Sequence, residues 1–136
     1  MRPRPYAAGV ALLTPDSRVL LLQRSDDGTW NLPGGRIEPG ETAWAAALRE
    51  AREEAGWSPE DTGTAPWGSP IQTRTRRGGA FVTFPLRVGW AFLPGLNRES
   101  LAWAWVRPSD AAARFPLHPG VAQVLAQVPT RMPAQR

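Results

Sequence analysis

The stretch GGRIEPGETAWAAALREAREEAGW, residues 34–57, carries the clearest helix signal in the chain. Thr42 is a suitable N-cap, and neither glycine nor proline follows it until Gly56, which is a suitable C-terminal stop. The spacing predicts a helix over 42–55. Three glutamates lie in its last turns: Glu50, Glu53 and Glu54. Carboxylates at these spacings repel one another and face the negative end of the helix dipole, so folding alone does not explain them.

A divalent cation explains such a group of carboxylates. A helical wheel places the three glutamates within an arc of about 100°. It predicts a separate buried face: Trp44, Ala47, Leu48, Ala51 and Ala55. Mg²⁺ takes hard oxygen ligands and retains waters and substrate phosphates, so the pattern favours a Mg²⁺ site, with Mn²⁺ as a substitute. The alternative is a solvated charged face, with helical ion pairs such as Arg49 with Glu53.

Short apolar runs on both sides of this helix predict strands. Turn residues separate them, and the strands expected are 6–14, 19–24, 71–76, 80–92 and 100–106. Pro85 argues for an edge or a bulge within its strand. Loops are expected over 25–35 and 58–70, short helices over 108–115 and 119–128, and a frayed tail over 131–136. The order indicates an α/β domain with a mixed sheet flanked by helices.

The composition fits one soluble domain spanning residues 1–136. The absence of cysteine excludes disulfides and thiolate metal sites. The N-terminal apolar run is only as long as a strand, so neither a signal peptide nor a membrane span is expected, and cytoplasmic residence is the default. The net charge of +4 comes from 16 arginines without any lysine. This suits an anionic substrate, but a bias in the codon composition of the source genome is the stronger explanation.

The same stretch resembles the Nudix box, G-x5-E-x7-R-E-U-x-E-E-x-G-U, where U is a bulky apolar residue. Gly35 is followed after five residues by Glu41 and after seven more by REAREEAGW, residues 49–57. Ala51 is small for the first U and Trp57 is large for the second, which concerns packing rather than ligands. The resemblance extends over about residues 6–107, and it implies an α/β/α sandwich.

The resemblance also implies roles for residues of the box. The Gly34 carbonyl with Glu50, Glu53 and Glu54 would hold metal, Glu41 would support these ligands, and Arg49 would orient the glutamates. Nudix proteins hydrolyse a nucleoside diphosphate linked to another group, so a small nucleotide substrate is expected: a nucleoside triphosphate, a dinucleoside polyphosphate or a nucleotide sugar. Glu99 is a candidate for a further ligand or for the general base.

Substrate contacts are predicted at four further residues: Arg24, Trp30, Arg74 and Phe81. Arg24 would contact phosphate, and Trp30 or Phe81 would contact a base. Two interpretations of the arginine cluster at 74–77 compete: a contact with phosphate or RNA, and an ordinary charged hairpin. Two alternative functions therefore remain, removal of pyrophosphate from RNA 5′ ends and nucleotide sensing without hydrolysis. A homodimer is compatible with the family.

Overall fold

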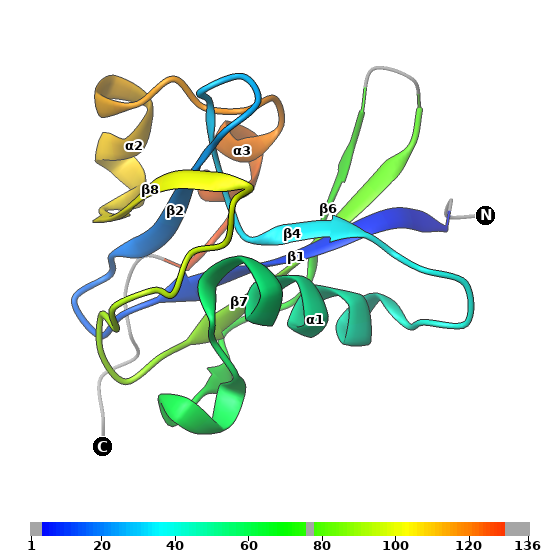
Figure 1. Cartoon of the computed structure of the whole chain (residues 1–136), viewed down its shortest axis with the longest axis horizontal. Helices are drawn as coiled ribbons and strands as arrows, with labels where there is room; N and C mark the ends of the chain where they lie inside the picture. The colour runs from blue at the N-terminus through cyan, green and yellow to red at the C-terminus, as the bar shows by residue number, and fades with distance from the viewer. Residues whose placement is uncertain (1–3, 76–77, 130–136) are drawn as a thin grey trace.

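The computed structural model describes residues 4–75 and 78–129, and its strands form one mixed sheet. Figure 1 shows α1 on one side of this sheet and α2 and α3 on the other. The chain order is β1 (Pro5–Leu13), β2 (Val19–Arg24), β3 (Trp30–Asn31), β4 (Gly34–Arg36), α1 (Ala43–Ala55), the 3₁₀ helix η1 (Pro59–Asp61), β5 (Ala65–Pro66), β6 (Ile71–Arg74), β7 (Ala80–Arg87), β8 (Ser100–Val106), α2 (Pro108–Arg114) and α3 (Val121–Leu125). The expected α/β/α architecture is confirmed.

Strand β1 lies at the centre of the sheet because both of its faces are apolar. It pairs parallel with β7 and antiparallel with β2 and β4, while β8 pairs with the far edge of β2. Alternate residues of β1, such as Val10 and Leu13, contribute to two different hydrophobic cores. One core lies beneath α1, and the other includes α2 and α3.

Helix α1 begins and ends as its sequence predicts. The Thr42 hydroxyl accepts a hydrogen bond from the Ala45 amide at 3.1 Å. Gly56 adopts a left-handed conformation with φ of 66°, and its amide donates to the Arg52 carbonyl. The buried face consists of small residues, which let the helix approach the sheet closely: Ala46, Ala47, Ala51 and Ala55.

The predicted buried face was wrong at Trp44, which is exposed and packs edge-on against Phe84 of β7. The two departures from the Nudix pattern are both accommodated by packing. Ala51 is completely buried, and Trp57 fills the same core while its indole N–H donates to the Thr62 hydroxyl at 3.0 Å.

Several predicted boundaries were also wrong. Part of the loop expected over 25–35 forms β3 and β4, and part of the loop over 58–70 forms η1 and β5. These elements are only two or three residues long. The strands β3, β4 and β5 are held by pairing with β2, β1 and β7, which local propensity does not reveal, whereas η1 is closed by the Ser58 amide donating to the Asp61 carboxylate at 3.0 Å. The strand expected over 80–92 ends at Arg87.

Pro85 does not mark an edge, because β7 has neighbours on both sides. The partner strand is instead interrupted there. Strand β6 pairs with β7 up to Thr83, and β5 pairs with it from Leu86 onward. The Pro85 carbonyl accepts a hydrogen bond from the Trp67 amide in this gap, where the missing proline N–H costs no ladder bond.

Two predicted features, the tail at 131–136 and the residues Arg76 and Arg77, lie outside the described residues. In the part of the chain that the structure describes, no helix has the length and apolar character needed to cross a membrane.

The close approach of β1 and β4 requires glycine at Gly9. Replacing Gly9 by alanine is expected to lower the free energy of unfolding by about 1–3 kcal/mol. The added Cβ would collide with the Pro33 carbonyl oxygen and lie 3.1 Å from the Gly34 Cα. Urea unfolding measures the change. Gly95→Ala is the control, since its added Cβ meets no atom closer than 4.0 Å. Equal urea midpoints for the two variants would contradict this account.

Candidate active site

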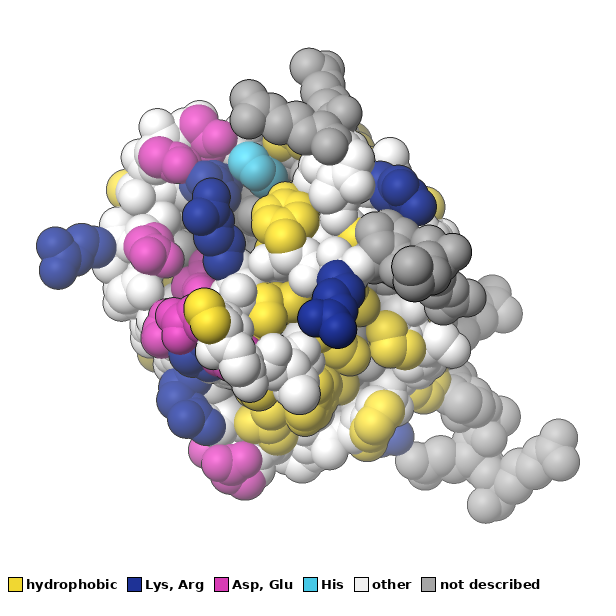
Figure 2. All heavy atoms as spheres, turned by 90° about the vertical axis from the view of Figure 1, so that its right-hand side faces the viewer, with side chains coloured by type: hydrophobic (Ala, Val, Ile, Leu, Met, Phe, Trp, Pro, Cys, Tyr) yellow, Lys and Arg dark blue, Asp and Glu magenta, His cyan; other side chains and the backbone are white. Residues whose placement is uncertain are grey.

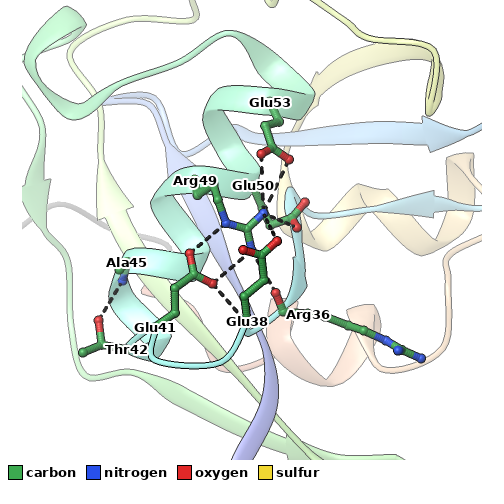
Figure 3. Close-up of polar contacts among 8 residues, drawn as sticks. All are labelled: Arg36, Glu38, Glu41, Thr42, Ala45, Arg49, Glu50 and Glu53. Atoms are coloured by element: carbon green, nitrogen blue, oxygen red, sulfur yellow. Dashed lines mark hydrogen bonds and ion pairs between the residues drawn. The ribbon is translucent and has the colours of Figure 1, made fainter.

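Arg49 of α1 organises the carboxylates of the box (Figure 3). Its guanidinium contacts Glu41 through two nitrogens, at 2.7 and 3.1 Å, and donates to Glu50 at 2.9 Å. It also donates to the Arg36 carbonyl at 3.0 Å. Three nitrogens of one planar fork are therefore used at once, which arginine can do and lysine cannot. These contacts are the ones that an orienting role of Arg49 would use, and the role itself stays a prediction.

Glu41 links this ion-pair network to the loop before α1. One of its oxygens accepts the Glu38 amide at 2.9 Å while both oxygens face Arg49. The Arg49 guanidinium, as the main cause, and the Glu38 amide lower the pKa of the Glu41 carboxyl. Arg49 thus contacts both Glu41 and Glu50, and the supporting role of Glu41 stays a prediction.

Glu50 lies between Arg49 and the main chain of β4. A Cβ added at Gly35 would come within 2.5 Å of the Glu50 Cδ, so glycine is needed for this close approach. Burial raises the pKa of Glu50, partly offset by the hydrogen bond from Arg49. Glu53 is the most exposed of the three helix glutamates, with 53% of its side chain accessible, and lies 3.5 Å from Arg49.

Glu54 faces the interior of the site from the last turn of α1. Its Oε1 accepts a hydrogen bond from the Gly34 amide at 2.9 Å. Burial is the main cause that raises the pKa of Glu54 to about 8, with the nearby charges of Glu50 and Glu99 adding to the effect and the Gly34 hydrogen bond opposing it. The charged form of Glu54 therefore has too few positive groups nearby to offset the cost of its burial.

The three helix glutamates do not form a ready three-ligand cluster. Within residues 4–75 and 78–129, no three acidic or histidine side chains are grouped as metal ligands. Glu50 and Glu53 turn toward Arg49, whereas Glu54 turns toward the Gly34 amide. The three carboxylates are therefore not grouped as one ligand set in this arrangement, although Glu50 lies close enough to Glu54 to help raise the pKa of Glu54.

A cavity of about 330 Å³ joins Glu54 to residues from distant parts of the chain. Its lining includes Arg24 and Asp26 at the end of β2, Gly34 of β4, and Glu99 and Ser100 at the start of β8. The Ser25 amide donates to the Glu99 carbonyl at 2.9 Å, which ties the two loops together. Arg24, Gly34, Glu54 and Glu99, all predicted from the sequence as site residues, are thereby brought to one cavity.

Asp26 is a cavity residue that the sequence analysis missed. Its carboxylate pairs with Arg24 through two hydrogen bonds, at 3.0 and 2.6 Å. The Arg24 hydrogen bonds are the main cause that lowers the pKa of Asp26. The sequence feature that could have identified Asp26 is an acidic residue two positions after a basic residue at the end of a strand. This spacing lets the two side chains meet. Arg24 is thus held at the cavity by an exposed acidic partner.

The other predicted substrate contacts are not among the residues that line this cavity. Trp30 is 9% exposed and packs on Phe115 with ring centroids 4.4 Å apart, so its ring belongs to the core. The tip of Phe81 lies beside Gly9 and Gly34. Arg74 is exposed at the end of β6. These three residues do not join Arg24 at the cavity.

Charged side chains gather on one part of the surface. Figure 2 shows Asp and Glu side chains along one edge of the view with arginines among them, while hydrophobic side chains occupy the centre. In the ion pairs of Arg24 and of Arg49, each guanidinium serves more than one carboxylate.

A model of the NUDIX domain matches residues 3–128. The chain belongs to the Nudix family. The matched range extends beyond the region 6–107 that carries the resemblance in sequence, and it includes α2 and α3. The Nudix family is one of pyrophosphohydrolases, so the expected enzyme class and the expected fold agree with this assignment.

Relatives of this Nudix chain include named nucleotide hydrolases. It is 34% identical over 113 residues to the nucleoside triphosphatase NudI of Escherichia coli, an alignment covering 73% of this chain and 79% of that protein. It is 47% identical over 51 residues to a putative 8-oxo-dGTP diphosphatase of Bacillus subtilis, covering 38% of this chain but only 34% of that protein. The structure of the Escherichia coli dihydroneopterin triphosphate pyrophosphohydrolase superposes with a TM-score of 0.74, at 27% identity and with coverage of 93% and 96% of the two chains.

Proposed function

We propose that this Nudix protein hydrolyses a phosphoanhydride bond in a small nucleotide, a nucleoside diphosphate linked to another group, with the help of a divalent cation. The observation that carries the proposal is the cavity in which Arg24, the Gly34 main chain, Glu54 and Glu99 meet beside the Arg49 network. A cationic fork beside several carboxylates suits a polyphosphate that arrives with a metal ion.

The residues present fit Mg²⁺. The donors are all hard oxygens, and the glycine at Gly35 leaves room for the Glu50 carboxylate against the main chain. Glu50, Glu53, Glu54 and the Gly34 carbonyl would hold the ion, and Mn²⁺ would fit the same donors. A bound divalent cation would supply neutralisation of the phosphate charge and activation of the attacking water.

The protein's own residues orient the substrate and the carboxylates. Arg24 would bind a phosphate oxygen after exchanging its Asp26 partner for the substrate. Arg49 fixes Glu50 and Glu41 so that few side-chain rotations remain to be lost on binding. Glu99, held at the cavity by the Ser25 amide, serves either as a further ligand or as the group that accepts a proton from water.

The names of the relatives favour triphosphates as substrates. NudI is a nucleoside triphosphatase, and the Escherichia coli structure is that of a dihydroneopterin triphosphate pyrophosphohydrolase. We therefore place nucleoside triphosphates first in a substrate panel, followed by dinucleoside polyphosphates, nucleotide sugars and triphosphorylated RNA. Hydrolysis is measured as phosphate released after phosphatase treatment, with Mg²⁺, with Mn²⁺ and with a chelator. No release from any substrate with metal present would contradict the proposal, as would equal release with the chelator.

Replacing Arg24 by glutamine is expected to raise KM roughly 10- to 100-fold, since it removes a charged donor to phosphate. The kcat should change much less than KM. Arg18→Gln is the matched control, because Arg18 makes a similar ion pair with Asp16, at 2.8 Å, in the turn between β1 and β2 away from the cavity. Steady-state kinetics on the best substrate measures both constants, and an unchanged KM would exclude a phosphate contact at Arg24.

A further inference from the structure

The seven tryptophans differ sharply in how they are packed. Four are held in the interior or by hydrogen bonds from their indole N–H groups: Trp30, Trp57, Trp67 and Trp105. Three are exposed, of which Trp44 packs against Phe84 and Trp90 lies in the segment between β7 and β8. The third, Trp103, is 39% exposed in the middle of β8.

The register of β8 places Trp103 beside the cavity. Trp103 is the direct cross-strand neighbour of Leu22 on β2, just as Trp105 is of Leu20. Directly opposed residues of an antiparallel pair share a face and have Cβ atoms about 5 Å apart. Leu22 belongs to the core under α1 and also lines the cavity, so Trp103, which is not itself in the lining, lies on the α1 face beside a residue that borders the cavity.

The strand is also irregular between Trp103 and the cavity. The pairing of β2 with β8 shifts by one residue between Gln23 and Arg24, so Leu101 is an extra residue in β8 and is 63% exposed. Such bulges bend a strand and redirect its side chains. Ser100, the next residue, already lines the cavity. An exposed apolar strip, Leu101 and Trp103, therefore leads directly to a strongly charged hollow.

The hollow and the strip suit different parts of a nucleotide. The cavity carries Arg24, Asp26, Glu54 and Glu99, and its volume of about 330 Å³ is near the lower end for small-molecule sites. It suits phosphates and metal rather than a flat uncharged ring. An exposed indole at its rim offers the stacking surface that the cavity lacks.

We propose that Trp103 forms a base-binding subsite, on which a nucleobase of the substrate stacks while its phosphates occupy the adjoining cavity. This inference rests on the proposed hydrolysis of nucleotides and adds the residue that recognises the ring. The ring belongs either to the nucleoside diphosphate or to the group linked to it, and the chemistry at Trp103 is the same.

Kinetics of matched tryptophan variants test the subsite. Trp103→Ala should raise KM for a nucleotide roughly 5- to 100-fold with little change in kcat, whereas Trp103→Phe should recover much of the loss. Trp90→Ala is the control, since Trp90 is 56% exposed but lies between β7 and β8, without the cross-strand pairing to a cavity residue that Trp103 has. If Trp103→Ala raises KM for both a nucleoside triphosphate and a dinucleoside tetraphosphate, the stacked ring belongs to the nucleoside diphosphate. If it raises KM for the dinucleotide alone, the stacked ring belongs to the linked group.

A binding measurement separates this inference from the proposed function. Indole N–H signals of the ¹⁵N-labelled protein are recorded with Mg²⁺ and either a nucleoside 5′-monophosphate, which has a ring but no anhydride, or inorganic phosphate. Trp103→Phe identifies the Trp103 signal. We expect the monophosphate to shift that signal and inorganic phosphate to leave it unchanged. This readout applies even if the wild-type protein hydrolyses no substrate in the panel, an outcome that removes only the proposed function.

Two results would overturn the base-binding subsite at Trp103. Equal KM values for Trp103→Ala and Trp90→Ala, together with a Trp103 signal that does not respond to the monophosphate, would overturn the subsite. Sedimentation is run on the same variants. A wild-type dimer that Trp103→Ala dissociates, with KM unchanged, would instead assign the strip to self-association and would also overturn the inference.

Discussion

Replacing Glu54 by glutamine is expected to lower kcat by roughly 10²- to 10⁴-fold without weakening the fold. Glu54 lines the cavity, and its raised pKa shows that few positive groups stabilise its carboxylate. The neutral amide of glutamine can neither bind a metal ion as an anion nor accept a proton. The glutamine oxygen can still accept the Gly34 amide. Because the raised pKa means that folding must either take up a proton at Glu54 or bury its charge, and glutamine requires neither, the free energy of unfolding at neutral pH should be unchanged or higher.

The Glu54 prediction is checked by kinetics and urea unfolding on the same preparation. Glu60→Gln is the control, because Glu60 lies exposed in η1 and is absent from the cavity lining. It should change neither activity nor stability. Calorimetric titration with Mn²⁺ should show weaker binding to Glu54→Gln than to the control. A near-normal kcat for Glu54→Gln would remove Glu54 from the catalytic machinery.

Replacing Arg49 by lysine is expected to lower kcat/KM by roughly 10- to 100-fold. Lysine retains the positive charge, but one ammonium group cannot serve Glu41, Glu50 and the Arg36 carbonyl together. The carboxylates would then lose their fixed orientation. Arg52→Lys is the control, since Arg52 lies on the same helix, is exposed and hydrogen-bonds Ser58 outside the network.

A double-mutant cycle shows whether Arg49 acts through Glu41. The effects of Arg49→Lys and Glu41→Gln on kcat/KM should be far from additive, because both changes break one bidentate ion pair. Mn²⁺ titration provides a second readout, in which both variants should bind the ion more weakly than Arg52→Lys does. Additive effects with normal Mn²⁺ binding would show that Arg49 does not position the metal ligands.

The parts of the structure that the sequence predicted well are those governed by local chemistry. The ends of α1 follow from Thr42 and Gly56, and β2 and β8 follow from runs of apolar residues between turn signals. The apolar residues of β8 do not reveal which of its tryptophans is exposed. Trp103 is 39% exposed, whereas Trp105 packs against Phe92 and its indole N–H donates to the Phe92 carbonyl.

The sequence by itself determined the family, the extent of the main helix and which residues of the box are candidates for holding a metal, because these depend on residue types at fixed spacings along one segment. Only the tertiary structure decided that Arg24, Glu54 and Glu99 share one cavity, that Glu50 and Glu53 turn toward Arg49, and that Trp103 rather than Trp30 is open to a ligand. The physical reason is that exposure and convergence depend on strand pairing and packing between segments far apart in the chain, and spacing along the chain does not specify either.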